Sequence, residues 1–198
     1  FVSPGEFIPI AEQSSLIADI GQWVMEHVFA LVAQHQARIP DQLSVSINLS
    51  PRQLEDASLV IMVKELLQKY SVRACQFELE ITEYSISEES ESILRNMHEL
   101  SSLGFRFALD DFGTGQASLT YLQRLHPDLI KIDRTFVDGV NKNHANATMV
   151  GAMTVMAHCL GLRVVAEGVE TEEELEFLRD THCDEIQGYF ISKPNVLI

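Results

Sequence analysis

The hydrophobic and polar positions of the chain change their spacing repeatedly, from short apolar runs to helical periodicity and back. The short runs have strand length and strand composition, and they cover residues 43–48, 76–82, 105–110, 129–133, 163–167 and 185–188. Between several of them, apolar residues recur at every third or fourth position, which predicts helices over 16–31, 93–100 and 149–160.

Helix boundary residues fit this alternation. Ser50 precedes Pro51, a favoured first helical residue, and Thr171 precedes three glutamates that suit a helix N-terminus. Gly104 and Gly161 come just before predicted strands, where a helix ends on a left-handed residue. Strands that alternate with helices predict a parallel α/β fold.

Two layouts of such a fold compete, a doubly wound open sheet and a (β/α)8 barrel. A nucleotide-binding open sheet would have a glycine-rich turn after its first strand, but Gly113 and Gly115 follow a pair of aspartates instead. The barrel is favoured because polar residues end the predicted strands, and the carboxyl ends of barrel strands converge on one mouth. These residues are Asn48, Glu80, Asp110, Lys131, Glu167 and Gln187.

The adjacent pair Asp110 and Asp111 is the sharpest of these features. Two carboxylates after an apolar strand are costly unless a cation neutralises them, and one aspartate can bridge two metal ions while its neighbour binds one. A solvated turn is the alternative, and it would suit an isolated pair better. The glycines at 113 and 115 favour a functional loop.

Glu80 and Asn48 are further candidate metal ligands. Glu80 alternates with apolar residues in a strand whose second face is expected to be covered by helices, so its carboxylate needs a partner. Asn48 offers a neutral oxygen, although alone it is more often a turn residue. Glu83, just past the strand, is better interpreted as a hydrogen-bond acceptor that fixes a loop.

Three more residues have two interpretations each. Lys131 could polarise a water molecule or stabilise phosphate charge. The alternative is an ordinary salt bridge with Asp110 or Glu167. Glu167 is a metal ligand or a general base. Gln187 either binds a nucleobase or holds a water molecule.

Composition and charge narrow the class of protein. The 198 residues are 46% hydrophobic, as in a folded domain, and 29 acidic residues against 14 basic ones give a net charge of −15. That charge argues against a nucleic-acid polymer or an anionic membrane surface as partner. Three cysteines without a CxxC pair fit a reducing, cytoplasmic setting. No segment is expected to span a membrane.

Taken together, these residues resemble the EAL-domain family of cyclic di-GMP phosphodiesterases, over essentially the whole chain. The resemblance rests on several blocks that occur in the family's order. They are Phe7 to Glu12, Asn48 to Ser50, Glu80 to Glu83, Asp110 to Gly115 followed by Ser118 and Leu119, Lys131 to Asp133, Ala166 to Thr171, and Gln187 to Tyr189.

The resemblance implies a TIM-like barrel that hydrolyses cyclic di-GMP to linear pGpG with two Mg²⁺ or Mn²⁺ ions. It implies metal ligation by Asn48, Glu80, Asp110, Asp111 and Glu167.

It also implies roles for residues that do not only bind metal. Lys131, Glu167 and Gln187 are expected to act at the attacking water, and Gln187 also near the substrate. Asp133 and Glu170 are expected on the guanine side, and Glu83 is expected to anchor the loop that begins at Asp111 and is tied to homodimer formation.

One departure from the family concerns the N-terminus. The signature Glu-Ala-Leu block is expected roughly ten residues before Phe1, so we expect residues 1–198 to be an EAL-type domain that lacks its first strands. By itself this chain is then expected to be weakly active or inactive. A sensory or cyclase domain could precede it, and the parent protein could be anchored in a membrane. The competing functions are an inactive cyclic di-GMP receptor and a protein-interaction module.

Overall fold

A computed structural model describes residues 2–36, 40, 43–83, 91–115 and 119–195. The backbone divides into two compact units, and each is described by itself. The first unit comprises Phe1–Ile81 and Glu88–Phe107, and the second comprises Thr82–Ser87 and Ala108–Ile198. Ser118, part of one motif block, lies outside the described residues.

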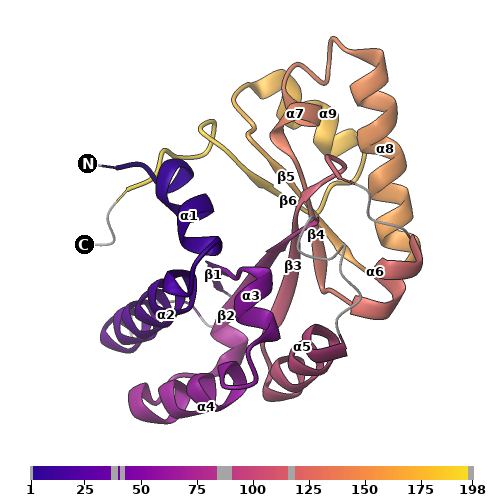
Figure 1. Cartoon of the computed structure of the whole chain (residues 1–198). Coiled ribbons are helices and arrows are strands. Elements are labelled where there is room, and N and C mark those ends of the chain that lie inside the picture. Colours follow the sequence, from indigo (N-terminus) through magenta and orange to yellow (C-terminus); the bar gives the residue numbers. More distant parts are fainter. Residues whose placement is uncertain (1, 37–39, 41–42, 84–90, 116–118, 196–198) are drawn as a thin grey trace. The chain divides into compact units, whose positions relative to one another are not determined.

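The first unit pairs two parallel strands and packs helices around them (Figure 1). The strands β1 and β2 pair with Asn48 opposite Glu80, and helix α2 contacts α1, α3 and α4. The elements are α1 (Pro4–Glu12), α2 (Leu16–His35), β1 (Val45–Asn48), α3 (Pro51–Glu55), α4 (Leu59–Tyr70), the 3₁₀ turn η1 (Ala74–Gln76), β2 (Phe77–Thr82) and α5 (Glu91–Leu103).

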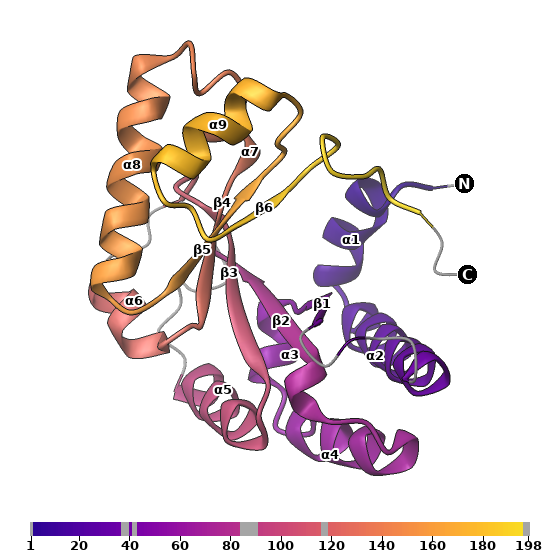
Figure 2. The same ribbon diagram turned by 180° about the vertical axis from the view of Figure 1, so that it is seen from behind.

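The second unit carries parallel strands in the order β3-β4-β5-β6, and α8 contacts β4 and β5 (Figure 2). Since each strand pairs with the next one along the chain, strand ends that are far apart in sequence lie at one edge of this sheet. The elements are β3 (Arg106–Phe112), α6 (Leu119–Leu125), β4 (Leu129–Ile132), α7 (Arg134–Val137), α8 (His144–Cys159), β5 (Arg163–Glu167), α9 (Glu172–Asp180) and β6 (Glu185–Gln187).

The boundary residues behave as the sequence predicts. Ser50 and Gln53 form a capping box at α3, and Thr171 forms one with Glu174 at α9. Gly104 and Gly161 have positive φ angles of 103° and 76°, the conformation in which helices end on glycine.

Helix α2 forms where predicted, but it buries a different face. The helical periodicity of residues 16–31 includes Trp23, which is 59% exposed, whereas the buried residues are Ile17, Met25, Phe29 and Val32. The periodicity of residues 149–160 likewise includes both Met149, which is exposed, and Met153, which is buried. Both helices are apolar on more than one side, so their periodicity could not identify the side that faces the sheet.

Helix α2 is also, among the described residues, the one helix long and apolar enough to cross a membrane by length and composition. The sequence pattern predicted no such segment, because Asp19 and Glu26 interrupt it. One side of α2 packs against the strands of the first unit, with Ile17, Met25, Phe29 and Val32 buried. The Phe29 ring stacks on Phe77 of β2 with centroids 4.1 Å apart, and both rings are fully buried.

We expect Phe29→Ala to lower the free energy of unfolding by about 3–5 kcal/mol, because it opens a cavity against Phe77 and Phe105. Trp23→Ala in the same helix is the matched control, with an expected loss under about 1 kcal/mol. Urea unfolding measures both. Equal losses would contradict the placement of α2 against β2.

Candidate functional site

The chemistry of the second unit starts from a bulge in β3. Leu109 pairs with Ile130 and Phe112 with Ile132, so Asp110 and Asp111 together face one residue of β4. Asp111 has a φ of 54°, in the left-handed region that aspartate enters more readily than most residues. The bulge interrupts the alternation of side chains, and two successive carboxylates serve one site instead of pointing to opposite faces.

These two carboxylates meet a third one from β5. Asp110, Asp111 and Glu167 each offer an oxygen, and the three oxygens lie within 4.8 Å of one another. All three side chains are half-buried. Carboxylate oxygens at this spacing are the ligands that Mg²⁺ and Mn²⁺ prefer in proteins.

Lys131, on the strand between them, contacts two of these acids. Its Nζ lies 3.2 Å from Asp110 Oδ1 and 2.7 Å from Glu167 Oε1, and the lysine is 5% exposed. The salt bridge considered from the sequence is therefore present with both candidate partners. Three carboxylates beside one ammonium leave two negative charges in excess, which suits one further divalent cation.

Asp110 supplies a second sign that a cation fits. Its Oδ1 is buried and receives no hydrogen bond of acceptable geometry from the described residues, although the Lys131 ammonium faces it. A buried carboxylate oxygen without a hydrogen bond is costly. The donor set and this oxygen together fit a divalent metal ion.

Glu83 holds the loop that follows the two aspartates. It is 5% exposed, and its Oε2 accepts hydrogen bonds from the backbone N–H groups of Gly113 and Gly115, both at 3.0 Å. A Cβ at Gly115 would lie 2.8 Å from the Glu83 carboxyl carbon, so a side chain there would displace this contact.

The segment 168–171, which follows Glu167, is fixed from the β4 side by Arg134. Arg134 Nη2 lies 2.8 Å from Glu170 Oε1. Gly168 has a φ of 74°, and a Cβ there would lie 2.4 Å from Arg134 Cγ. The arginine stem therefore occupies the space that a side chain at position 168 would need.

Glu174 fixes the same segment from within α9. It is 4% exposed, its Oε2 accepts from the N–H groups of Glu170 (2.9 Å) and Thr171 (3.1 Å), and its Oε1 accepts from Gly139 (2.9 Å). Burial alone would raise the pKa of Glu174, but the hydrogen bonds from Glu170, Gly139 and Thr171 outweigh it and hold the pKa below its ordinary value.

Two remaining candidates of this unit are placed at strand ends. Gln187 ends β6 opposite Glu167 and is exposed, and its carbonyl accepts from the Val169 N–H at 3.1 Å. Asp133 follows β4 and caps α7 by accepting from the Thr135 N–H at 3.0 Å.

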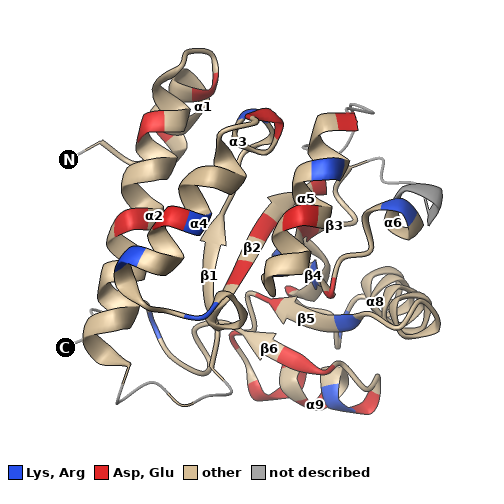
Figure 3. Ribbon diagram, turned by 90° about the horizontal axis from the view of Figure 1, so that it is seen from below, with Lys and Arg blue, Asp and Glu red and all other residues tan. Residues whose placement is uncertain are grey.

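Asn48 and Glu80 belong to the first unit. They lie opposite each other in the β1–β2 pair, and the Leu49 N–H donates to the Glu80 carbonyl at 2.8 Å. Glu80 is 7% exposed, so the strand buries this carboxylate as well as its apolar face. Figure 3 shows the acidic residues that interrupt β2.

The sequence did not predict that Arg134 and Glu174 contact Glu170. The threonine–glutamate spacing of 171 and 174 is a capping-box signal, and it could have identified Glu174 as more than an acid near a helix dipole. Nothing in the sequence distinguishes Arg134 from a solvated surface arginine.

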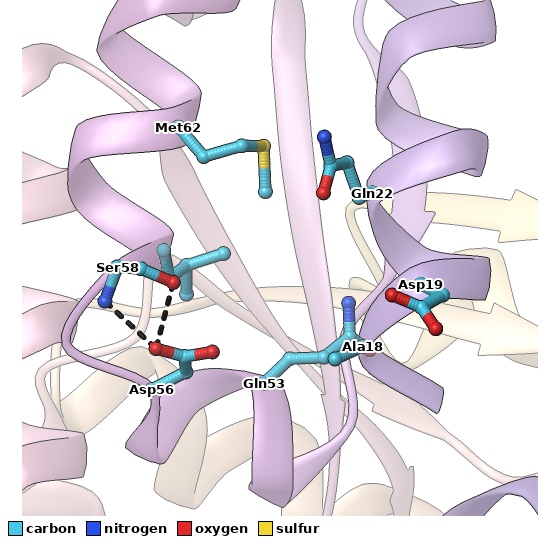
Figure 4. Close-up of a pocket in the computed structure, with 8 residues that line it drawn as sticks. Ala18, Asp19, Gln22, Gln53, Asp56, Ser58 and Met62 are labelled. Carbon is cyan, nitrogen blue, oxygen red and sulfur yellow. Dashed lines mark hydrogen bonds between the residues drawn. The ribbon is translucent and has the colours of Figure 1, made fainter. Parts of the chain in front are cut away.

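A cavity of about 180 Å³ in the first unit carries none of these residues (Figure 4). Side chains of α2, α3 and α4 line it, and its Asp56 already accepts hydrogen bonds from the Ser58 N–H and hydroxyl at 2.8 and 2.7 Å. These hydrogen bonds, from the backbone first, lower the pKa of Asp56.

Comparison with known proteins points in one direction. The model of the EAL domain matches residues 1–194. The bifunctional diguanylate cyclase/cyclic di-GMP phosphodiesterase MucR of Pseudomonas aeruginosa is 35% identical over 193 residues, which are 98% of this chain and 28% of that protein. The chain thus spans about a quarter of the length of the curated relatives it matches.

Solved structures agree. A c-di-GMP complex of the PaMucR phosphodiesterase has 35% identity and a TM-score of 0.91, covering 98% of this chain and 78% of that one. A manganese/cy-diGMP complex of Klebsiella pneumoniae BlrP1 has 28% identity and a TM-score of 0.80, covering 87% and 44%. The predicted TIM-like fold is confirmed by these matches.

The left-handed conformation at Asp111 gives a test of the bulge. We expect Asp111→Ala to be less stable than Asp111→Gly by about 1 kcal/mol, because only glycine enters this region without steric cost. Both variants lose one carboxylate and should bind Mn²⁺ more weakly than the unsubstituted chain. Urea unfolding in EDTA measures the first effect and calorimetric titration the second. Equal stability of the two variants would contradict the bulge.

Proposed function

The chain belongs to the EAL domain family, and from that premise we propose that it hydrolyses cyclic di-GMP to linear pGpG with divalent cations. The observation that carries the proposal is the acidic cluster of Asp110, Asp111 and Glu167 around the Lys131 ammonium. The name of the relative MucR and the solved complex of its phosphodiesterase with c-di-GMP support the substrate.

The proposed metal ligands are Asp110, Asp111 and Glu167, which lie together in the second unit, and the family resemblance adds Asn48 and Glu80. We propose that these residues would hold Mg²⁺ or Mn²⁺ in a two-metal site, in which Asp110 would be one of the ligands. When bound, such cations stabilise phosphate charge and lower the pKa of water. The buried Asp110 Oδ1 and the excess negative charge support this assignment.

The chain's own side chains handle the proton and orient the reactants. Glu167 takes one proton from the attacking water at a carboxylate oxygen, and the Lys131 ammonium 2.7 Å away stabilises negative charge on the phosphate. The water oxygen forms a bond to phosphorus while the bond from phosphorus to the ribose 3′-oxygen breaks. The 3′-oxygen takes a proton from solvent and becomes a hydroxyl, Glu167 releases its proton to solvent, and pGpG keeps its phosphate on the 5′-oxygen.

Substrate recognition is assigned to side chains beside this cluster. Gln187, opposite Glu167, holds the water or contacts the nucleotide through its exposed amide. Glu170 offers carboxylate oxygens that match the N1–H and 2-amino donors of guanine. Asp133 is assigned to the guanine side as well, although one of its carboxylate oxygens already accepts a hydrogen bond as the cap of α7.

We also propose that the domain acts as a homodimer in the cytoplasm, as part of a longer signalling protein. The Glu83 contacts that hold Gly113 and Gly115 support a defined loop at the proposed interface. Helix α8 adds an exposed apolar side with Met149 and Val155, and residues 144–159 contain no Lys, Arg, Asp or Glu. The name of MucR, a cyclase and phosphodiesterase in one protein, supports a multidomain parent.

Turnover tests the function directly. We expect the domain, extended at its N-terminus with a Glu-Ala-Leu segment, to convert cyclic di-GMP to pGpG in Mn²⁺. Glu80→Ala and Asp110→Ala should reduce the rate by at least about 100-fold, since each removes a metal ligand. Chromatography of the nucleotide products measures this.

Asp138→Asn, at an exposed acid of the second unit, is the control and should leave the rate unchanged. Binding of cyclic di-GMP without turnover would favour the receptor function instead. Neither binding nor turnover would favour an interaction module.

Dimer formation has its own test. Val155→Glu should shift the N-terminally extended domain from dimer to monomer in analytical ultracentrifugation, because a charge on an apolar interface is left without water or partner. Glu176→Lys, at an exposed position of α9, is the control. A dimer that persists in Val155→Glu contradicts the use of α8.

A further inference from the structure

Two contacts outside the metal site converge on a single residue, Glu170. Arg134 reaches its side chain at 2.8 Å, and Glu174 accepts from its backbone N–H at 2.9 Å. The two contacts come from different elements, since Arg134 begins α7 after β4 and Glu174 lies in the first turn of α9. Side chain and backbone of Glu170 are thus restrained separately.

The Arg134 contact is more than an exposed ion pair, which by itself contributes little energy. The arginine stem lies on the backbone of Gly168, where a Cβ would approach Cβ, Cγ and Cδ of Arg134 to between 2.4 and 2.9 Å. Because the stem packs there, the guanidinium can take fewer directions. Its N–H groups are therefore oriented toward the Glu170 carboxylate.

The Glu174 contact joins two chain segments. Its carboxylate accepts from Glu170 and Thr171 on one side and from Gly139, in the turn between α7 and α8, on the other. A buried carboxylate with three backbone donors is a strong restraint, because each N–H would otherwise lose its partner. The segment 168–171 is therefore held to the region around α7, which also contains Arg134.

The opposite side of the loop is held as well. The Val169 N–H donates to the Gln187 carbonyl at 3.1 Å, and the Phe190 N–H donates to the Val169 carbonyl at 3.0 Å. Residues 168–171 are thus held between α7, α9 and the end of β6, which leaves the backbone that carries Glu170 little freedom to lose on binding.

We infer that Arg134 and Glu174 are positioning residues that orient Glu170 for the guanine base and so set the base specificity of the site. The inference rests on the proposed function. The contact of Arg134 with Glu170 Oε1 restrains the orientation of a carboxylate that can accept hydrogen bonds from a ligand with N–H donors. Guanine offers such donors on its N1 and 2-amino groups, whereas the corresponding edge of adenine offers an acceptor at N1.

The test compares Arg134→Gln and Glu174→Gln with the matched controls Arg179→Gln and Glu173→Gln, at exposed positions of α9. Both test variants should exchange the amide hydrogens of residues 170 and 171 faster than the unsubstituted domain, without nucleotide present. Unchanged exchange would overturn the restraint itself. Thermal unfolding identifies any variant that has lost its fold. Arg134→Lys keeps the charge and the aliphatic stem, so its exchange rate should lie between those of Arg134→Gln and the unsubstituted domain.

The second measurement is the affinity of the N-terminally extended domain for cyclic di-GMP and for cyclic di-AMP in Ca²⁺. In both test variants we expect cyclic di-GMP affinity to fall about three- to tenfold, the cost of ordering one freed side chain, and cyclic di-AMP affinity to change less. The Michaelis constant should rise while kcat stays within about twofold.

The outcomes separate the inference from the function it rests on. Equal losses for the two nucleotides, or a loss in kcat alone, would overturn positioning of Glu170 while leaving the phosphodiesterase proposal intact. If the unsubstituted domain binds neither nucleotide, the proposed function fails and takes the base specificity with it, and the exchange measurement still decides whether the loop is restrained.

Discussion

The Lys131 ammonium lies in the middle strand of three and contacts a carboxylate from the strand on either side, Asp110 on β3 and Glu167 on β5. Buried carboxylates repel one another and resist desolvation, so this ammonium is what permits them to gather at the sheet edge before a cation binds. It leaves their excess charge only partly balanced. The same contact therefore stabilises the cluster and keeps it attractive to a divalent cation.

Two other acids of the second unit, outside this cluster, hold the loops that follow its strands. Glu83 and Glu174 are both buried, and each accepts hydrogen bonds from backbone N–H groups of a neighbouring loop. One holds the loop after Asp111 and the other holds the loop after Glu167. The two loops that follow these acid-bearing strands are thus fixed by glutamates that do not belong to the acidic cluster.

The sequence was sufficient for the parts of the molecule that obey local rules. The presence and order of the strands, the Ser50 and Thr171 caps and the glycines at helix ends depend on a few neighbouring residues, and they were predictable, although β3 runs to Phe112, two residues past its predicted end. The buried face of α2 was not, because apolar residues occur around the helix and tertiary packing selects Phe29 over Trp23. The partners of Lys131 were predictable as a set, since strand order places three strand ends together. The bulge and the Arg134–Glu170 contact depend on backbone geometry that no residue pattern specifies.

The bulge in β3 makes the site depend on the count of residues as well as on their identity. Two residues of β3 occupy the space of one on β4, so the pair of aspartates exists only while that extra residue is present. Loss of a single codon there would restore regular pairing, preserve the strand and remove one carboxylate in the same step. In this chain, a deletion at that one point would therefore change the number of carboxylates at the sheet edge through the backbone as well as through the residue removed.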